Sequence, residues 1–144
     1  MKKILALMLI LILGTSAAFA SSTNLFAVDY SVPEKFLNLT NIYDCSISDS
    51  FAAFINTSKL VKIVGFNNNG QLGNAVMESS RELVDVTGIN NIIKVATGDD
   101  FVVALTQAGK VYTWGMNDRG QLGTGDTENK KVPVAISSRS EEVV

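Results

Sequence analysis

The sequence predicts an all-β fold built from two copies of a four-stranded antiparallel unit. The first observation behind this prediction is an internal repeat, because residues 38–86 align with residues 88–136 without a gap. The second is the length of the apolar segments, which run for about five or six residues, are rich in Val, Ile and aromatic side chains, and end at Gly, Asp or Ser. Such segments are typical of β-strands, and an internal repeat sets the architecture before local propensity does.

The first 20 residues have the three parts of a secretory signal: a Lys pair, an apolar run and a small-residue exit ending in Ala-Phe-Ala. An uncleaved membrane anchor is the alternative, but the apolar run is about half of the roughly 20 residues that a membrane-spanning helix needs. We therefore expect a signal peptide at 1–20, a lead segment at 21–31, and a protein that is secreted or held in the periplasm or cell envelope, with no membrane contact after cleavage. The short Lys-Lys start is typical of a bacterial signal.

The repeat region covers residues 32–144. It comprises a first unit at about 38–87, a second unit at about 88–137 and the start of a further unit at 138–144. The first unit predicts strands at 42–47, 51–56, 60–65 and 82–86. The second unit predicts strands at the matching places, 92–97, 101–106, 110–115 and 132–136. Residues 32–36 resemble the last strand of a preceding unit, because Pro33 lies two periods before Pro133.

Two local patterns refine these strands. The segment FVVAL at 101–105 is apolar without alternation, which predicts a strand covered on both faces, as in a sheet stacked between two others. Gln107-Ala108-Gly109 predicts the hairpin that follows it. In the first unit the corresponding hairpin contains no glycine, which makes it the weaker prediction of the two.

A glycine-rich segment follows the third strand of each unit, reading GFNNNGQLG at 65–73 and GMNDRGQLG at 115–123. Its glycine spacing resembles a phosphate loop, but Gln121 and Leu122 replace the lysine and hydroxyl, and the segment joins two strands. We therefore interpret both copies as turns in which glycine supplies positive φ, leucine enters the core and the amide side chains bond the backbone. The structural positions predicted in this way are Gly65, Asn67, Gly70, Gln71, Leu72, Gly73, Trp114, Gly115, Asn117, Gly120, Gln121, Leu122 and Gly123.

Val111-Tyr112-Thr113-Trp114-Gly115, Asn117 and the segment 120–126 together resemble the repeat of the regulator of chromosome condensation family. The first unit matches less well, because Val64 replaces the tryptophan and residues 73–76 depart from Gly-x-Gly-Asp. The family's histidine is also missing, since it falls at Phe51 and Phe101. The resemblance implies a β-propeller, which family members build from seven repeats. Two repeats here predict a partial propeller of about two four-stranded antiparallel blades.

Two blades leave a sheet face uncovered on each side, because a propeller covers its faces by stacking further blades. Two explanations stay open. The chain is a fragment of a longer reading frame, which the end of the sequence inside a predicted strand favours, or several copies associate through the unpaired faces.

The residue types exclude several chemistries. The net charge of −2 and the lack of any basic cluster larger than a Lys pair argue against nucleic-acid binding. The chain has no histidine, which excludes Ser-His-Asp and Cys-His nucleophiles. The single cysteine, Cys45, aligns with Val95, which favours a buried apolar role. The acidic residues Asp99, Asp100, Asp118 and Asp126 lack the alternating spacing of a calcium loop. We therefore expect no catalytic residue, no bound metal and no cofactor.

The remaining prediction is a secreted scaffold that binds another protein or an extracellular ligand. Loop positions that differ between the two units are the candidate contact residues, and the alternative for them is a role as exposed turn residues. They are Phe66, Asn68, Asn69, Met116, Asp118 and Arg119. Two other functions stay open. One is an enzyme acting on extracellular polysaccharide, for which Asp49 and Asp99 recur at one strand end, and the other is a non-functional remnant of a longer repeat gene.

Overall fold

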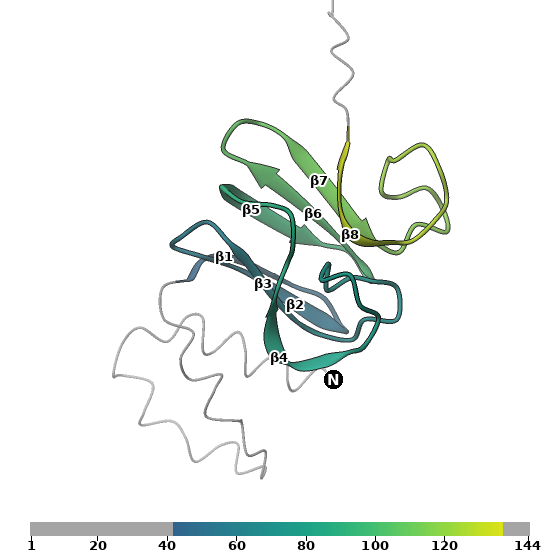
Figure 1. Cartoon of the computed structure of the whole chain (residues 1–144), viewed down its shortest axis with the longest axis horizontal. Helices are drawn as coiled ribbons and strands as arrows, with labels where there is room; N and C mark the ends of the chain where they lie inside the picture. The colour runs from purple at the N-terminus through teal and green to yellow at the C-terminus, as the bar shows by residue number, and fades with distance from the viewer. Residues whose placement is uncertain (1–41, 137–144) are drawn as a thin grey trace, which may run out of the picture. The chain divides into compact units, whose positions relative to one another are not determined.

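The structure is a computed structural model that describes residues 42–136 of the 144-residue chain (Figure 1). The predicted signal peptide, the lead segment at 21–31, the predicted strand at 32–36 and the start of a further unit at 138–144 lie outside the described residues. The described part of the chain contains no helix long and apolar enough to cross a membrane.

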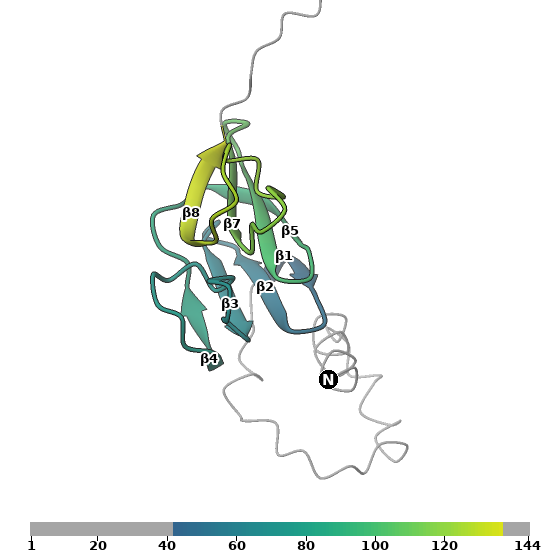
Figure 2. The ribbon, with the colours of Figure 1, turned by 90° about the vertical axis from the view of Figure 1, so that its right-hand side faces the viewer.

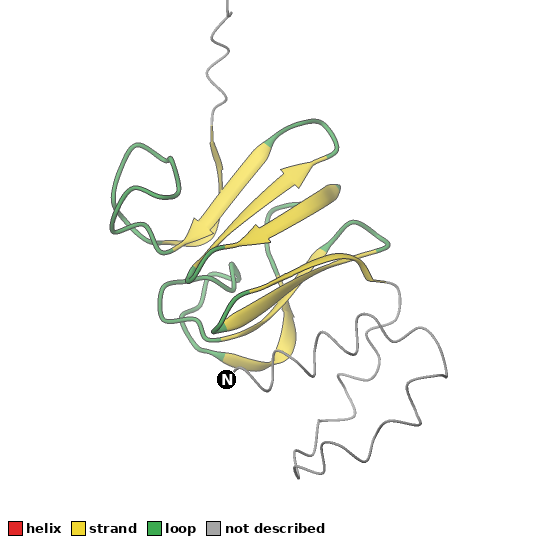
Figure 3. Cartoon of the chain, turned by 180° about the vertical axis from the view of Figure 1, so that it is seen from behind, coloured by secondary structure: helices red, strands yellow, loops and turns green. Residues whose placement is uncertain are grey.

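Eight strands form two four-stranded sheets, which Figure 3 shows in yellow. The first sheet has the order β1 (Ile42–Ile47), β2 (Phe51–Asn56), β3 (Val61–Gly65) and β4 (Ser80–Asp85). The second sheet has the order β5 (Ile92–Thr97), β6 (Phe101–Thr106), β7 (Val111–Gly115) and β8 (Lys130–Ile136). All neighbouring strands are antiparallel. The predicted all-β class, with two four-stranded antiparallel blades, is confirmed.

The register of the two sheets repeats with the period of the sequence. Cys45 of β1 pairs with Phe54 of β2, and fifty residues later Val95 of β5 pairs with Ala104 of β6. The first strand of each sheet also has a bulge at the same place, immediately after Ile42 and Ile92. The internal repeat of the sequence is therefore also a repeat of strand pairing, because equivalent residues are paired in the two sheets.

The last strand of each sheet begins two residues earlier than predicted. Ser80 pairs with Gly65, and Lys130 pairs with Gly115, in each case beyond a shift in register. Polar residues start both strands, and each strand lies at an edge of its sheet. An apolar pattern does not reveal a strand start of this kind, because an edge strand that continues past a bulge needs no apolar side chain there.

Both predicted hairpins form, including the one without glycine. Gly109 has a φ of 81°, and Lys59 takes the same left-handed region with a φ of 62°. The Asn56 side-chain oxygen accepts a hydrogen bond of 3.0 Å from the Leu60 N–H, which braces this second turn. Local bonding by asparagine thus supports a conformation that glycine adopts without strain.

The core lies between the two sheets, which pack face to face in the views of Figures 1 and 2. Buried side chains of β2 and β3 meet buried side chains of β5, β6 and β7 there. Trp114 of β7 is the largest of them and is fully buried. A buried tryptophan brings more apolar area to one position than any other residue, so this interface depends strongly on it.

The prediction that FVVAL is covered on both faces is wrong for the described residues. β2 is buried over all of Phe51–Ile55, whereas β6 alternates along its length. Val102 and Ala104 are buried against the first sheet, while the side chains between and beside them are only half-buried. The reason is the two-residue period of a strand: every second side chain of β6 points away from the first sheet, and no other described sheet lies on that side.

Candidate functional site

The two long loops lie at the same end of the sheets as the short turns between the first and second strands (Figure 1). The loop 66–79 joins β3 to β4, and the loop 116–129 joins β7 to β8. The Phe66 N–H donates to the Ser50 carbonyl at 3.0 Å, and the Met116 N–H donates to the Asp100 carbonyl at 2.8 Å. Each long loop is therefore fixed at its start by the short turn of its own sheet.

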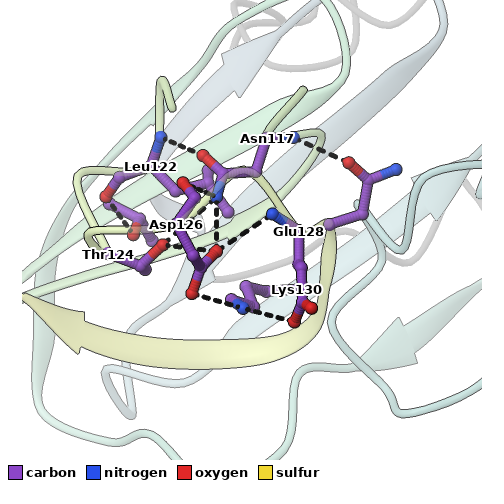
Figure 4. A network of polar contacts seen from close by, with 8 residues as sticks. Asn117, Leu122, Thr124, Asp126, Glu128 and Lys130 are labelled. Carbon is purple, nitrogen blue, oxygen red and sulfur yellow. Dashed lines mark hydrogen bonds and ion pairs between the residues drawn. The ribbon is translucent and has the colours of Figure 1, made fainter. Parts of the chain in front are cut away.

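A buried asparagine organises the interior of each loop. The Asn117 side-chain oxygen accepts from the Leu122 N–H at 2.9 Å, and its nitrogen donates to the Asp126 carbonyl at 2.9 Å (Figure 4). Asn67 makes the same bond to the Leu72 N–H and donates to the Val76 carbonyl. Both asparagines are fully buried. Each satisfies backbone groups that the turn leaves unpaired, so the loop conformation is held by side chains that do not reach the surface.

The glycine-rich turn of the first unit is also the joint between the two sheets. The Trp114 Nε1 donates to the Gln71 carbonyl at 2.9 Å, and the Gln71 Nε2 donates to the Asp100 carboxylate at 3.0 Å. A Cβ atom added at Gly73 would lie 2.7 Å from the Trp114 Nε1. Glycine is needed at this position because the indole occupies the space that a side chain would fill.

The predicted contact residues divide into three kinds. Phe66, Asn68, Asp118 and Arg119 are exposed, while Met116 is half-buried. Asn69 differs from all of these, since its side chain bonds Asp100 and also accepts from the Asn129 amide at 3.0 Å. Asn69 therefore contributes to the contact between the two units.

Sequence reasoning missed two exposed apolar side chains in the first loop. Val76 and Met77 are 44% and 46% exposed, beside a 47% exposure of Phe66 on the same loop. The second loop carries Asp126 and Thr127 at the matching places. The signal for Val76 was present in the sequence, because the departure of residues 73–76 from Gly-x-Gly-Asp puts a valine at the place of the aspartate. We refer to Phe66, Val76 and Met77 as the apolar tip.

The ionisable side chains of the loops brace the structure. The hydrogen bond from Lys130 to Asp126, at 2.9 Å, and then the bond from the Glu128 N–H hold the pKa of the Asp126 carboxyl below its ordinary value. The same bond to Asp126 raises the pKa of Lys130. Asp126, considered above for calcium, therefore pairs with a lysine of the next strand. No group of three or more His, Cys, Asp or Glu side chains that could hold a metal ion is present among residues 42–136.

The other candidate groups lie in the two short turns, which are in contact because the Ser50 hydroxyl donates to the Asp99 carbonyl at 3.1 Å, and on β1. Asp49 and Asp99 are exposed in the short turns, and within the described range no hydrogen bond or ion pair joins them. Cys45 is half-buried, and burial raises the pKa of its thiol, with a further contribution from Asp44. A raised thiol pKa disfavours the nucleophilic thiolate.

A shallow groove of about 530 Å³ lies at the end of the sheets opposite to the two long loops. It is lined by residues 88–91, 106–108, 110 and 112.

Comparison with known proteins agrees with this geometry. Residues 63–105 and 108–144, more than half of the chain, match the family model described as regulator of chromosome condensation (RCC1) repeat, and residues 92–121 match a second model of that repeat. The chain belongs to the RCC1 repeat family. The RCC1 match at 63–105 runs over β3, β4, β5 and β6, so one RCC1 sequence repeat joins half of the first sheet to half of the second.

Solved structures show the same fold. Human WBSCR16 superposes with a TM-score of 0.62 at 21% identity, over 72% of this chain and 27% of that one. Yeast RCC1 (Prp20) in complex with Kap60 gives 0.63 at 24% identity, over 70% and 24%. Prp20p from Saccharomyces cerevisiae gives 0.64 at 15% identity, over 72% and 27%. The chain thus spans about a quarter of the length of these structures. The comparison of this chain with curated proteins found no match.

Proposed function

We propose that this RCC1-repeat chain is an exported, non-catalytic scaffold that binds another protein or an extracellular ligand through its two long loops. The observation that carries the proposal is the apolar tip. Its three large side chains are each close to half-exposed on one loop, and Asn67 holds the backbone between them. Apolar side chains that stay exposed on a braced loop favour contact with an apolar surface on a partner.

The second loop complements the apolar tip with charge. Asp118 and Arg119 are exposed at the same end of the sheets, and the Arg119 N–H is held by the Gln121 side-chain oxygen at 2.9 Å. A partner that lies across both loops would therefore meet an apolar patch on one side and a mixed pair of charges on the other. Apolar contacts supply most of the affinity in such an interface, and charges fix its orientation.

Relatives of known structure support a binding role through their own partners. One yeast structure is a complex of RCC1 (Prp20) with Kap60, and the other is described with its binding to Gsp1p and histones. These two yeast proteins use the fold as a protein-binding scaffold, and this use supports the proposal for the present chain. The exposed carboxyls of Asp49 and Asp99 have no hydrogen bond to each other among the described residues, which favours a scaffold over an enzyme, because catalysis by paired carboxylates needs the two groups held together.

Binding is tested with the triple variant Phe66→Ser, Val76→Ser and Met77→Ser. Immobilised wild-type chain captures extracellular proteins of the producing organism, and the captured partner is then purified and titrated by calorimetry. We expect the triple variant to bind at least about tenfold more weakly, which corresponds to about 1.4 kcal/mol. Gln107→Ala, at the opposite end of the sheets, is the matched control and should keep wild-type affinity. An unchanged affinity in a triple variant with wild-type melting temperature would contradict the proposal.

Export is tested separately. The full chain is expressed in a bacterial host, and the protein recovered from the periplasm or medium is analysed by intact mass. We expect the exported form to begin at Ser21, because a small-residue exit precedes it. Retention of the complete chain in the cytosol would contradict export and leave the binding experiment unaffected.

A further inference from the structure

The groove at the end of the sheets away from the long loops lies between two segments that the fold holds in place. One wall is the linker at 88–91, which leads into β5, and the other is the hairpin between β6 and β7 (Figure 1). The Gln107 N–H donates to the Asn91 carbonyl at 2.9 Å, which ties the two walls together. The Ile92 N–H donates to the Lys59 carbonyl at 3.0 Å, which ties the linker to the hairpin of the first sheet. The groove is therefore preformed, which lowers the cost of binding a ligand there.

The only charged side chain of the groove is a lysine. Lys110 is exposed, and within residues 42–136 no carboxylate forms an ion pair with it. Its ammonium lies 5.1 Å from the centre of the Tyr112 ring, which is a weak contact for an exposed lysine. The residues that line the groove include no Asp and no Glu. The groove therefore has a positive charge in a chain of net charge −2, and this charge favours an anionic group on a ligand.

Two exposed carboxamides on the linker add neutral polar groups to the groove. The Asn91 Nδ2 donates to the Asn90 Oδ1 at 3.2 Å, which leaves the Asn90 Nδ2 and the Asn91 Oδ1 without a partner among the described residues. A pair of this kind offers both a donor and an acceptor, as the hydroxyl groups of a sugar need. Ile89, which is 8% exposed, and the half-buried Tyr112 ring supply apolar surface beside them. The groove thus combines a few polar groups with apolar surface, as small-molecule sites do.

The repeat does not require this set of side chains. The first unit has Leu60 at the place of Lys110 and Lys62 at the place of Tyr112, and Lys62 pairs with Asp85 at 2.6 Å. Both hairpins form in spite of these differences. The fold therefore explains the hairpin and does not explain why an ammonium and an aromatic ring lie beside the linker amides of the second unit.

We propose that the groove binds an acidic sugar, a ring that carries hydroxyl groups and one carboxylate, as a unit of an extracellular glycan. The Lys110 ammonium donates to the carboxylate, and the carboxamides of Asn90 and Asn91 bond the hydroxyl groups. The volume of about 530 Å³ is within the range of small-molecule sites. The groove lies at the end of the sheets away from the apolar tip, so the proposal does not depend on the proposed binding function.

An acidic peptide is a poorer occupant of the groove. Extended peptides commonly bind by pairing with a free strand edge. Thr106 and Tyr112 are the only lining residues that belong to strands, and both strands lie inside the second sheet, with neighbours on each side. The walls are a linker and a turn, which offer a peptide no strand to extend.

The ligand class is tested by titrating the ¹⁵N-labelled full chain with glucuronate, with glucose and with a capped glutamate, N-acetylglutamate amide. Glucuronate has a carboxylate where glucose has a hydroxymethyl group, so this pair of sugars isolates the charge. We expect amide shifts in the NMR spectrum at 88–91 and 106–112, and at least about tenfold tighter binding of glucuronate than of either other probe. The absence of these shifts, or equal affinities for the two sugars, would overturn the proposal. A capped glutamate that binds as tightly as glucuronate would assign the groove to acidic peptides instead.

Two variants test the residues independently. Lys110→Met removes the ammonium and keeps the length of the side chain, and Asn90→Asp adds a negative charge at an exposed position while keeping the acceptor for Asn91. We expect each variant to lose the preference for glucuronate and to bind glucose within about twofold of the wild type. Lys131→Met, an exposed lysine whose backbone contacts the first long loop, is the matched control and should keep the preference. A preference for glucuronate that survives in either variant with a wild-type spectrum elsewhere would overturn the proposal.

Discussion

The indole Nε1 of Trp114 donates a hydrogen bond of 2.9 Å to the backbone carbonyl of Gln71, across the boundary between the two sheets. Neither residue has more than 1% of its surface exposed. The single tryptophan of the chain is thus anchored in the glycine-rich turn of the preceding unit. This contact gives the turn of the first unit a structural role and explains the need for glycine at position 73.

Replacing Trp114 with phenylalanine should destabilise the chain by about 2–3 kcal/mol. The smaller ring leaves part of the interface unfilled, and the Gln71 carbonyl loses its buried donor. Urea unfolding followed by circular dichroism measures the change. Tyr112→Phe, on the same face of β7, is the control and should cost less than about 1 kcal/mol, since its half-buried ring is retained. A Trp114→Phe variant as stable as the control would argue against the bond to Gln71.

Asn117→Ala should cost about 3 kcal/mol, because it removes the acceptor of the Leu122 N–H and the donor to the Asp126 carbonyl inside a buried loop. Asn68→Ala removes an exposed asparagine of the first loop and should change the unfolding free energy by less than about 0.5 kcal/mol. Similar losses in the two variants would show that the Asn117 side chain does not organise its loop.

The pair Asp126–Lys130 gives the stability a defined dependence on pH. The folded state lowers the pKa of Asp126 from its ordinary 3.8, so its contribution is present above that value and is lost as the pH falls through the lower folded pKa. The folded state raises the pKa of Lys130 from 10.5, so that contribution is lost only as the pH rises through the higher folded value.

The measurement is the difference in urea midpoint between the wild type and Asp126→Asn as the pH is varied. We expect a small difference, because the Asp126 side chain is 41% exposed to solvent. The difference should be constant between about pH 5 and pH 9 and shrink below about pH 4. Lys130→Met should reproduce this profile on the acid side. A difference that grows toward acid pH would have the wrong sign for the pairing described here.

The strands could be predicted because each pattern occurs twice. The apolar segment at 101–106 is ambiguous alone, but its alignment with 51–56 and the turns around both copies identify a strand, and the structure has strands at these positions. The starts of β4 and β8 could not be found in the same way. They begin with polar residues beyond a bulge, where pairing to Gly65 and Gly115 determines the strand and side-chain hydrophobicity does not.

Contacts between the units were harder to predict than the units themselves. Asn69 varies between the two repeats, which suggested a free surface position, yet its partners Asp100 and Asn129 lie in the other unit. Alignment of the repeats reports which positions are shared, and it does not report which residues of successive units meet in space. The apolar tip was missed for a related reason, since Val76 was considered as a departure from a pattern and not as an exposed side chain, and Met77 was not considered.

The comparison of Gly73→Ala with Gly123→Ala tests most directly whether the glycine-rich turn is a joint between blades. The two glycines have nearly equal φ values of 63° and 68°, so the backbone strain that alanine introduces is the same in both variants. Only at Gly73 does the added methyl group meet the Trp114 indole. We predict that Gly73→Ala lowers the unfolding free energy by about 1–3 kcal/mol more than Gly123→Ala does. Equal losses in urea unfolding would contradict the account, because they would show that the turn carries no contact between the two sheets.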